Sequence, residues 1–261
     1  MLNKITGFNK FLLTFALAFV ANNAHAASVS DDVLAMAGEQ RELTQQTAKD
    51  YMYIGQHIFE ARARKSLETR LARMEHNQAV LRQAIKDNDS RDLLDYADIQ
   101  FKEYKASLET PYGAESASLV MDNSDVLLEI YDEVLKKMMA NDHSHFLQLY
   151  GMANSQSVRI ARIGKFYLAQ KDGITDYNSK KQIQSEIVAF EKTKALLEQE
   201  KANPGTVADG LNEVNHLWRL VRGFFLDVNK EDLPIVVDTS TNSLQESMDK
   251  IAKHYLKAQR S

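Results

Sequence analysis

The residues with the clearest chemical potential lie together near the start of the chain, in the stretch 37–55, which reads AGEQRELTQQTAKDYMYIG. Arg41 carries a planar guanidinium with a permanent charge and several donors, a group suited to a flat oxyanion. Gln40, Thr44 and Gln45 place two amides and a hydroxyl within about one helical turn of it. A helix that presents this layer has the donors to bind nitrate, a carboxylate or a similar small anion.

The same residue types also have a purely structural interpretation. In a helix, Gln40, Thr44 and Thr47 fall on one stripe, where a helical bundle normally has apolar side chains. Polar residues in such a seam often only fix its register, and Arg41 would then pair with Glu42, with Glu39 or with an acid on a neighbouring helix. The sequence leaves both interpretations open, a ligand site and a register device.

Helices must position these residues, and the sequence predicts helices nearly throughout. Gly (10) and Pro (3) are scarce in 261 residues, and apolar side chains recur every three or four positions. We therefore expect an all-α protein. The stripes and polar turns place its helices at about 31–58, 67–85, 91–110, 115–139, 144–172, 176–201, 205–228 and 236–259.

The two halves of this helical pattern superpose at a single offset of 116 residues. Matched pairs occur on several helices: Gln40 with Gln156, Lys49 with Lys165, Tyr51 with Tyr167, Met74 with Phe190, Glu75 with Glu191, and Ser124 with Ser240. This register indicates an internal duplication, with two tandem antiparallel four-helix-bundle units over 27–140 and 141–261. It also makes Gln156 a candidate ligand residue. Whether the units pack side by side or share a long helix across residue 141 stays open.

The first 26 residues have the pattern of a secretory signal peptide. Lys4 and Lys10 are followed by an apolar run over 11–21, and small residues at Ala24 and Ala26 suit a cleavage site. The run is about half as long as a membrane span. We expect cleavage near Ala26 and a soluble mature chain in the periplasm.

Composition and motifs argue against several functional classes. Cleavage would change the net charge from −4 to −6, which disfavours a nucleic-acid partner. The chain has no Cys, and we find no catalytic triad pattern, phosphate loop or paired-carboxylate signature. Glu213 and His216 form a lone E-x-x-H, and His143 and His145 lie in a polar linker. We therefore expect no enzyme activity, no cofactor and no metal site.

With both copies in view, the chain resembles the extracytoplasmic N-terminal domain of type IV pili methyl-accepting chemotaxis transducers, the PilJ type, which is related to nitrate/nitrite sensor domains. The first-copy matches are Ala37, Gly38, Gln40, Arg41, Leu43, Gln45, Ala48, Lys49 and Tyr51. The second-copy matches are Ala153, Gln156, Arg162, Lys165 and Tyr167. Departures include Glu42 where Met is usual, Asn154 in place of the Gly, and Ser157 in place of the Arg.

The resemblance implies a helical sensor or binding module in which Arg41 contacts an anion where two first helices meet across a dimer. The tandem copies have the arrangement to imitate that dimer within one chain. Ser157 supplies no charge opposite Arg41, so Arg159 or Arg162 would have to compensate, or a homodimer would pair two copies of Arg41. The family's transducers continue into a membrane helix and a signalling domain, so we expect a membrane-bound signalling partner here.

A second hypothesis is a non-catalytic interaction or structural module of a pilus or envelope assembly, without a small-molecule ligand. Under either hypothesis a partner needs a surface to bind, and the most apolar stretch after the signal peptide lies in the seventh expected helix, with Leu217, Trp218, Val221, Phe224 and Phe225. These residues form either the core face of that helix or an exposed docking surface for a partner.

Overall fold

The structure is a computed structural model that describes residues 30–140, 142–174, 178–226 and 233–259. All regular secondary structure in these ranges is α-helical, which confirms the predicted fold class. The predicted signal peptide, residues 1–26, lies outside the described residues. Within them, no helix combines the length and the hydropathy that crossing a membrane requires.

The helices form two four-helix bundles, as the duplication predicts. The first bundle contains α1 (Asp31–Gly55), α2 (Glu60–Ala84), α3 (Asn88–Glu109) and α4 (Ala114–Met139). The second contains α5 (His145–Lys171), α6 (Ser179–Gln199), α7 (Gly205–Leu226) and α8 (Pro234–Ala258). In each bundle the first helix packs against the second and the fourth, and the third packs against the fourth.

The helix ends follow local chemistry, with one correction to the prediction. Ser30 caps α1 by accepting from the amide of Val33 at 3.4 Å, and Asp87 caps α3 by accepting from that of Ser90 at 2.8 Å. The predicted first helix was too long at its C-terminal end, because α1 ends at Gly55 and Ile58 lies in the following loop. Two residues of that loop, His57 and Phe59, have positive φ and reverse the chain.

The second helix begins at Glu60, several residues before the predicted Leu67. The segment 60–66 reads EARARKS, which has no apolar stripe but is rich in good helix formers. Its side chains are mostly exposed, so helix propensity rather than core packing sets this boundary.

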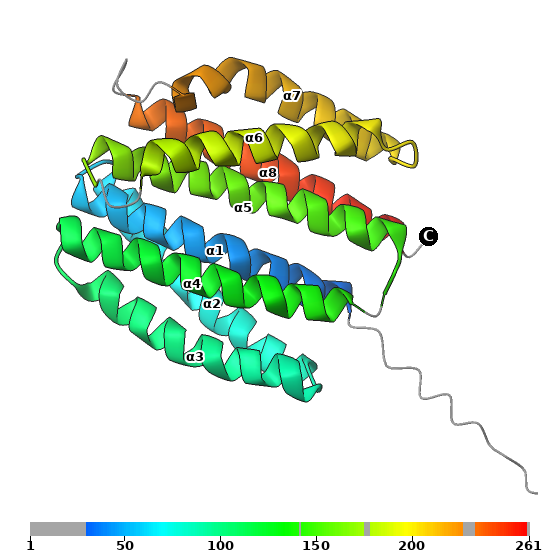
Figure 1. The fold of residues 1–261 in the computed structure, drawn as a ribbon, viewed down its shortest axis with the longest axis horizontal. Coiled ribbons are helices and arrows are strands. Elements are labelled where there is room, and N and C mark those ends of the chain that lie inside the picture. The colour runs from blue at the N-terminus through cyan, green and yellow to red at the C-terminus, as the bar shows by residue number, and fades with distance from the viewer. Residues whose placement is uncertain (1–29, 141, 175–177, 227–232, 260–261) are drawn as a thin grey trace, which may run out of the picture.

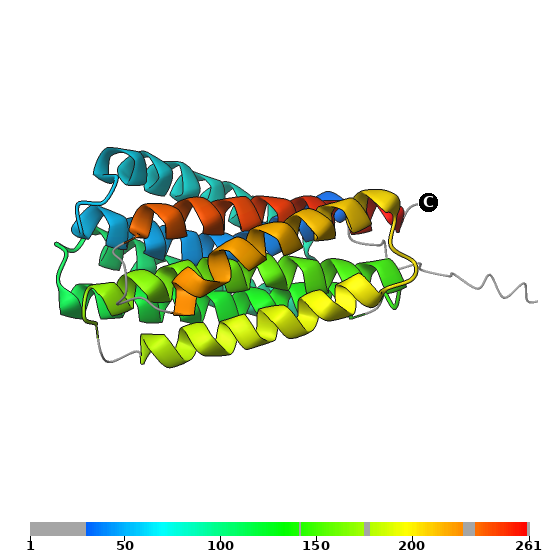
Figure 2. The same cartoon turned by 90° about the horizontal axis from the view of Figure 1, so that it is seen from above.

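The two bundles lie side by side, and the contact between them is made mainly by α1 against α5 (Figures 1 and 2). These helices run in the same direction, since Leu34 contacts Tyr150 near one end and Gln56 contacts Leu168 near the other. The two units do not share one long helix, because α4 ends at Met139 and α5 begins at His145.

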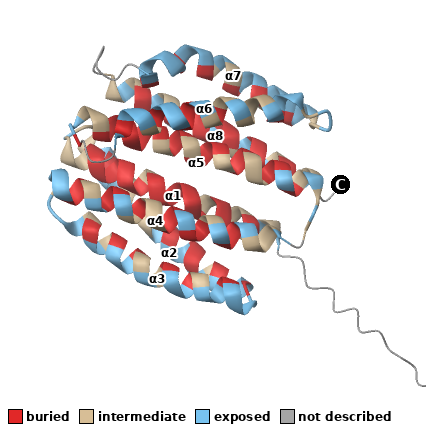
Figure 3. Cartoon of the chain, viewed as in Figure 1, coloured by how far each residue is buried: buried red, intermediate tan, exposed pale blue. Residues whose placement is uncertain are grey.

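The central position of α1 explains its unusual composition. It packs against α2, α4 and α5, and Figure 3 shows it buried along most of its length. Gln40, Thr44 and Thr47 are fully buried, as the stripe predicts. Arg41 and Glu42 are also buried, because α5 covers a face that would be exposed in a single bundle, and Gln45 is buried against Ser124 of α4.

Candidate functional site

The α1–α5 seam brings residues that are 116 positions apart into contact with each other. The Tyr150 hydroxyl donates to the carbonyl of Leu34 at 2.9 Å. The side chain of Asn154 lies against Gly38, where a Cβ atom would be only 2.9 Å from Nδ2 and 2.4 Å from the Tyr150 hydroxyl. Equivalent residues of the two copies therefore meet along a local pseudo-twofold axis, and Gly38 leaves the space that Asn154 fills.

Asn154 bridges two adjacent residues of α1. Its Oδ1 accepts from Nη1 of Arg41 at 2.5 Å, and its Nδ2 donates to Oε1 of Glu42 at 2.9 Å. Arg41 also donates through Nε to Asp132 of α4 and through Nη2 to Ser155 at 3.3 Å. The ion-pair partner of Arg41 is thus an acid on a neighbouring helix, one of the alternatives that the sequence left open.

On one side of this seam, between α4 and α5, lies a pocket of about 570 Å³ that we call the basic pocket. Its charged lining includes three permanent cations, Arg41, Lys136 and Arg159, against two acids, Asp132 and Asp142. Arg41 and Arg159 come from different bundles, so the pocket joins the two copies. It has the charge and the donors that a small anion requires.

Of the two arginines expected to compensate for Ser157, only Arg159 lines the basic pocket. It donates through Nη1 to Glu186 at 3.1 Å, and its buried Nε has no hydrogen-bond partner among the described residues. Arg162 instead donates to Asp125 at 3.0 Å and to Glu186 at 2.7 Å.

The other four predicted ligand residues are bonded inside their own bundles. The amide of Gln40 donates to the carbonyl of Met74 and to the Tyr131 hydroxyl, both at 3.1 Å. The amide of Gln156 donates to the carbonyl of Phe190 at 2.7 Å. Met74 and Phe190 are themselves 116 residues apart, so the duplication extends to this hydrogen bond.

Thr44 and Gln45 are also engaged within the first bundle. The Thr44 hydroxyl donates to the carbonyl of Arg41 at 2.8 Å, and the amide of Gln45 donates to the carbonyl of Ser124 at 2.9 Å. Of the five predicted ligand residues, Arg41 is the one that appears among the described residues lining the basic pocket. The side chain of Arg41 therefore faces the pocket, whereas those of Gln40, Thr44, Gln45 and Gln156 are bonded inside the bundles.

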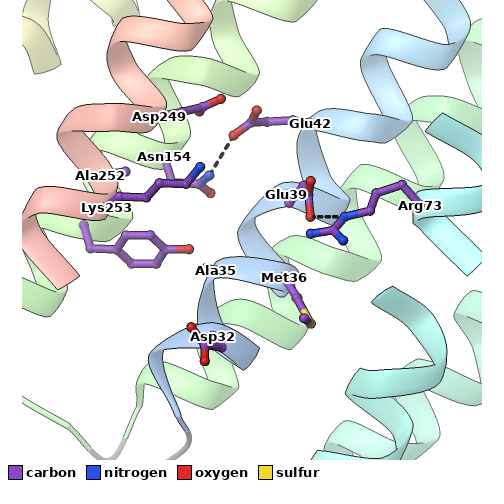
Figure 4. A pocket seen from close by; sticks show the side chains of 11 residues that line it. Asp32, Ala35, Met36, Glu39, Glu42, Arg73, Asn154, Asp249, Ala252 and Lys253 are labelled. Atoms are coloured by element: carbon purple, nitrogen blue, oxygen red, sulfur yellow. Dashed lines mark hydrogen bonds and ion pairs between the residues drawn. The ribbon is translucent and has the colours of Figure 1, made fainter. Parts of the chain in front are cut away.

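On the other side of Asn154, between α1 and α8, lies a pocket of about 310 Å³ that we call the acidic pocket (Figure 4). Glu42 and Asp249 point toward one another there, and Glu39 accepts from Arg73 at 2.9 Å at its edge. Burial, followed by the charge of Asp249, raises the pKa of Glu42 well above its usual value. Burial likewise raises the pKa of Asp249.

Sequence reasoning singled out neither Glu42 nor Asp249 as part of a site. One available indication was Glu42 itself, an acid at a position where the resembling family has Met. The contribution of Asp249 depends on the packing of α8 against α5, for which the sequence carries no local pattern.

The described residues contain no group of three or more His, Asp or Glu arranged to hold a metal ion. Comparisons of the chain with protein families, with curated proteins and with solved structures found no match.

Proposed function

We propose that the chain is a soluble periplasmic sensor or ligand-binding protein that recognises a small anion in the basic pocket and signals through a membrane-bound partner. The observation that carries the proposal is the position of Arg41 and Arg159, one from each copy, on the wall of one pocket. The resemblance to PilJ-type sensor domains supports the same class of ligand and of partner.

The hydrogen bonds of Arg41 are compatible with ligand exchange. Its bond to Ser155 is long, at 3.3 Å, and the Ser155 hydroxyl donates to the carbonyl of Gly151 at 2.8 Å. An incoming anion can therefore take over Nη2 of Arg41 without leaving Ser155 unsatisfied. The Nε of Arg159 is buried without a partner among the described residues, so a small turn of this side chain toward the pocket would supply a second donor.

The rest of the lining favours one kind of anion. Leu135, Met139 and Met152 give the pocket an apolar portion, and its volume of about 570 Å³ exceeds what a bare nitrate ion fills. A carboxylate that carries an apolar group would contact both parts. Nitrate and nitrite remain the ligands that the family resemblance suggests.

The test is thermal unfolding of the chain with a panel of nitrate, nitrite, short and apolar carboxylates, and amino acids. A ligand at about 100 times its Kd stabilises the folded state by about 2.7 kcal/mol. Arg41→Gln and Arg159→Gln should each remove most of this shift. Arg64→Gln is the matched control, since Arg64 is exposed and pairs only with Glu60 of its own helix in the described structure.

The proposal is wrong if no compound of the panel shifts unfolding of the unaltered chain. It is also wrong if both pocket variants keep the full shift.

An interaction module is the alternative function, and the outer face of α7 favours it. Trp218, Val221 and Phe225 are buried, whereas Leu220 is 60% exposed and Phe224 is 36% exposed. The apolar stretch is therefore divided between the core and the surface. Capture of an envelope partner that is lost on Phe224→Glu and kept on Arg41→Gln would favour this alternative.

A further inference from the structure

The acidic and basic pockets are two versions of one duplicated groove. Four residues of α1 that line the acidic pocket are Asp32, Ala35, Met36 and Glu39. Adding 116 to each gives four residues of α5 that line the basic pocket, Gln148, Gly151, Met152 and Ser155. In each pocket the other wall comes from the last helix of the other bundle, α8 for the acidic pocket and α4 for the basic pocket.

The two copies of the groove differ in charge. The acidic pocket has four acids against two bases; the acids are Asp32, Glu39, Glu42 and Asp249, and the bases are Arg73 and Lys253. Arg73 is engaged by Glu39, as Figure 4 shows. The pocket therefore has the opposite charge preference from its counterpart.

The innermost acids of the pocket, Glu42 and Asp249, accept hydrogen bonds from neutral side chains, and the hydrogen bond between their own carboxyl groups requires a proton. Glu42, which is 5% exposed, accepts from the amide of Asn154 at 2.9 Å. Asp249 accepts from the Ser157 hydroxyl at 2.5 Å. Two carboxyl groups that face each other away from water cannot both ionise without a cation between them. The charge of Lys253 on α8 opposes the rise in the pKa of Asp249, so Glu42 is the carboxyl that retains a proton unless a ligand cation enters the cavity.

We propose that the acidic pocket binds a compact organic cation, an alkylammonium ion, with its nitrogen between Glu42 and Asp249. An ammonium group has three N–H donors and suits two facing carboxylates. Tyr150, Ala35 and Met36 supply an apolar wall on which the alkyl chain would pack. The inference concerns a different pocket from the proposed anion site and does not depend on it.

Binding of such a cation would be linked to pH. The charged and titratable groups around Glu42 are Arg41 and Glu39 on α1, Asp249 and Lys253 on α8, Tyr150 on α5 and Arg73 on α2. Because burial and Asp249 raise the pKa of Glu42, the free pocket holds a proton that the ammonium ion replaces. Affinity should therefore increase with pH, and binding should release protons.

The experiment is calorimetric titration of the chain with putrescine, with butanediol and succinate as neutral and anionic probes of the same chain length. We expect putrescine alone to bind, several-fold more tightly at about pH 8 than at about pH 6. Titration in buffers of different ionisation heat should show proton release. Absence of binding, or equal binding of butanediol, would overturn the proposal.

Three variants distinguish binding in the acidic pocket from a general attraction of the cation to acidic residues. Glu42→Gln keeps an acceptor for Asn154 and should weaken putrescine binding at least about tenfold. Asp249→Asn should do the same, and it serves as the second variant if the first fails to fold. Glu133→Gln, at a half-exposed acid of α4, is the matched control and should change nothing.

Arg159→Gln distinguishes this proposal from the anion site, because Arg159 lines the basic pocket. It should abolish anion binding and leave putrescine binding intact. Unchanged putrescine affinity in both Glu42→Gln and Asp249→Asn would show that the cation binds elsewhere and refute the assignment.

Discussion

Lys49 and Lys165, which are 116 residues apart, each extend from the first helix of one bundle to the last helix of the other. Nζ of Lys49 donates to Oδ1 of Asn242 on α8 at 2.9 Å, and Nζ of Lys165 donates to Oδ1 of Asp125 on α4 at 2.7 Å. Both lysines are buried, with exposed fractions of 1% and 0%. The two contacts obey the same pseudo-symmetry as the α1–α5 seam and connect the bundles from both sides.

Lys165→Met should change how stability depends on pH. Burial lowers the pKa of Lys165 to about 8, although Asp125 opposes this effect. Between about pH 8 and pH 10.5 the unfolded chain therefore binds more protons at this site than the folded chain, and the free energy of unfolding rises with pH. The variant should lack this rise, which is on the order of 3 kcal/mol.

Denaturant unfolding of both proteins across this pH range measures the difference. Asp125 keeps Arg162 as a partner in the variant, at 3.0 Å, so the site does not lose its only cation. Lys250→Met is the control, because Lys250 is exposed and pairs with Glu246 one turn away. Parallel pH profiles for Lys165→Met and the unaltered chain would contradict the prediction.

Gly38→Ala should destabilise the protein by about 1–3 kcal/mol, the usual range for overpacking. The added Cβ would lie 2.4 Å from the hydroxyl of the buried Tyr150, so this side chain or α5 itself would have to shift. Gly223→Ala is a matched control, because its Cβ would have no neighbour within 4 Å in the described structure. That change should stabilise α7 by up to about 1 kcal/mol.

A second substitution identifies the atom responsible. Adding Tyr150→Phe to Gly38→Ala removes the hydroxyl that lies nearest to the new methyl group. The double variant should be more stable than the sum of the two single changes predicts. If the changes in free energy of unfolding of the two single variants simply add in the double variant, the contact with the Tyr150 hydroxyl is not the cause of the destabilisation.

The helices and the duplicated register could be predicted because both depend on local patterns. Turn residues and apolar stripes mark the helices, and one offset aligns the copies, down to the matched bonds of Gln40 and Gln156. The neighbours of each face of α1 could not be predicted. A helix with partners on three sides lacks the polar face that normally shows its orientation, so Arg41 and Glu42, adjacent in sequence, line different pockets.

Gln40→Leu should cost more stability than the equivalent change Gln156→Leu, by about 1 kcal/mol. Both amides donate to a helix carbonyl, but Gln40 also donates to the Tyr131 hydroxyl, which in turn donates to Gln78 at 2.6 Å. The first change therefore removes a bond from a buried network. The two positions are matched in residue type and burial, so chemical denaturation of the two variants compares their losses of unfolding free energy directly. Equal losses, or a larger loss at Gln156, would show that the Tyr131 network adds no stability.

Glu42→Gln should stabilise the folded protein near neutral pH, even though it replaces an ionisable residue of a buried polar seam. The pKa of Glu42 is raised in the folded state, chiefly by burial, so the unfolded chain loses this proton first as the pH increases. The free energy of unfolding then falls with increasing pH, from about pH 4.5 up to the raised pKa. Each pKa unit of that difference corresponds to about 1.4 kcal/mol. The neutral amide escapes this loss and can still accept from Asn154.

The measurement is the free energy of unfolding of each variant relative to the unaltered chain. For Glu42→Gln this difference should be larger at about pH 8 than at about pH 4, whereas the control Glu133→Gln should match the unaltered chain at both pH values. A variant that is less stable than the unaltered chain at both pH values would mean that Glu42 is ionised and favourably paired in the folded seam.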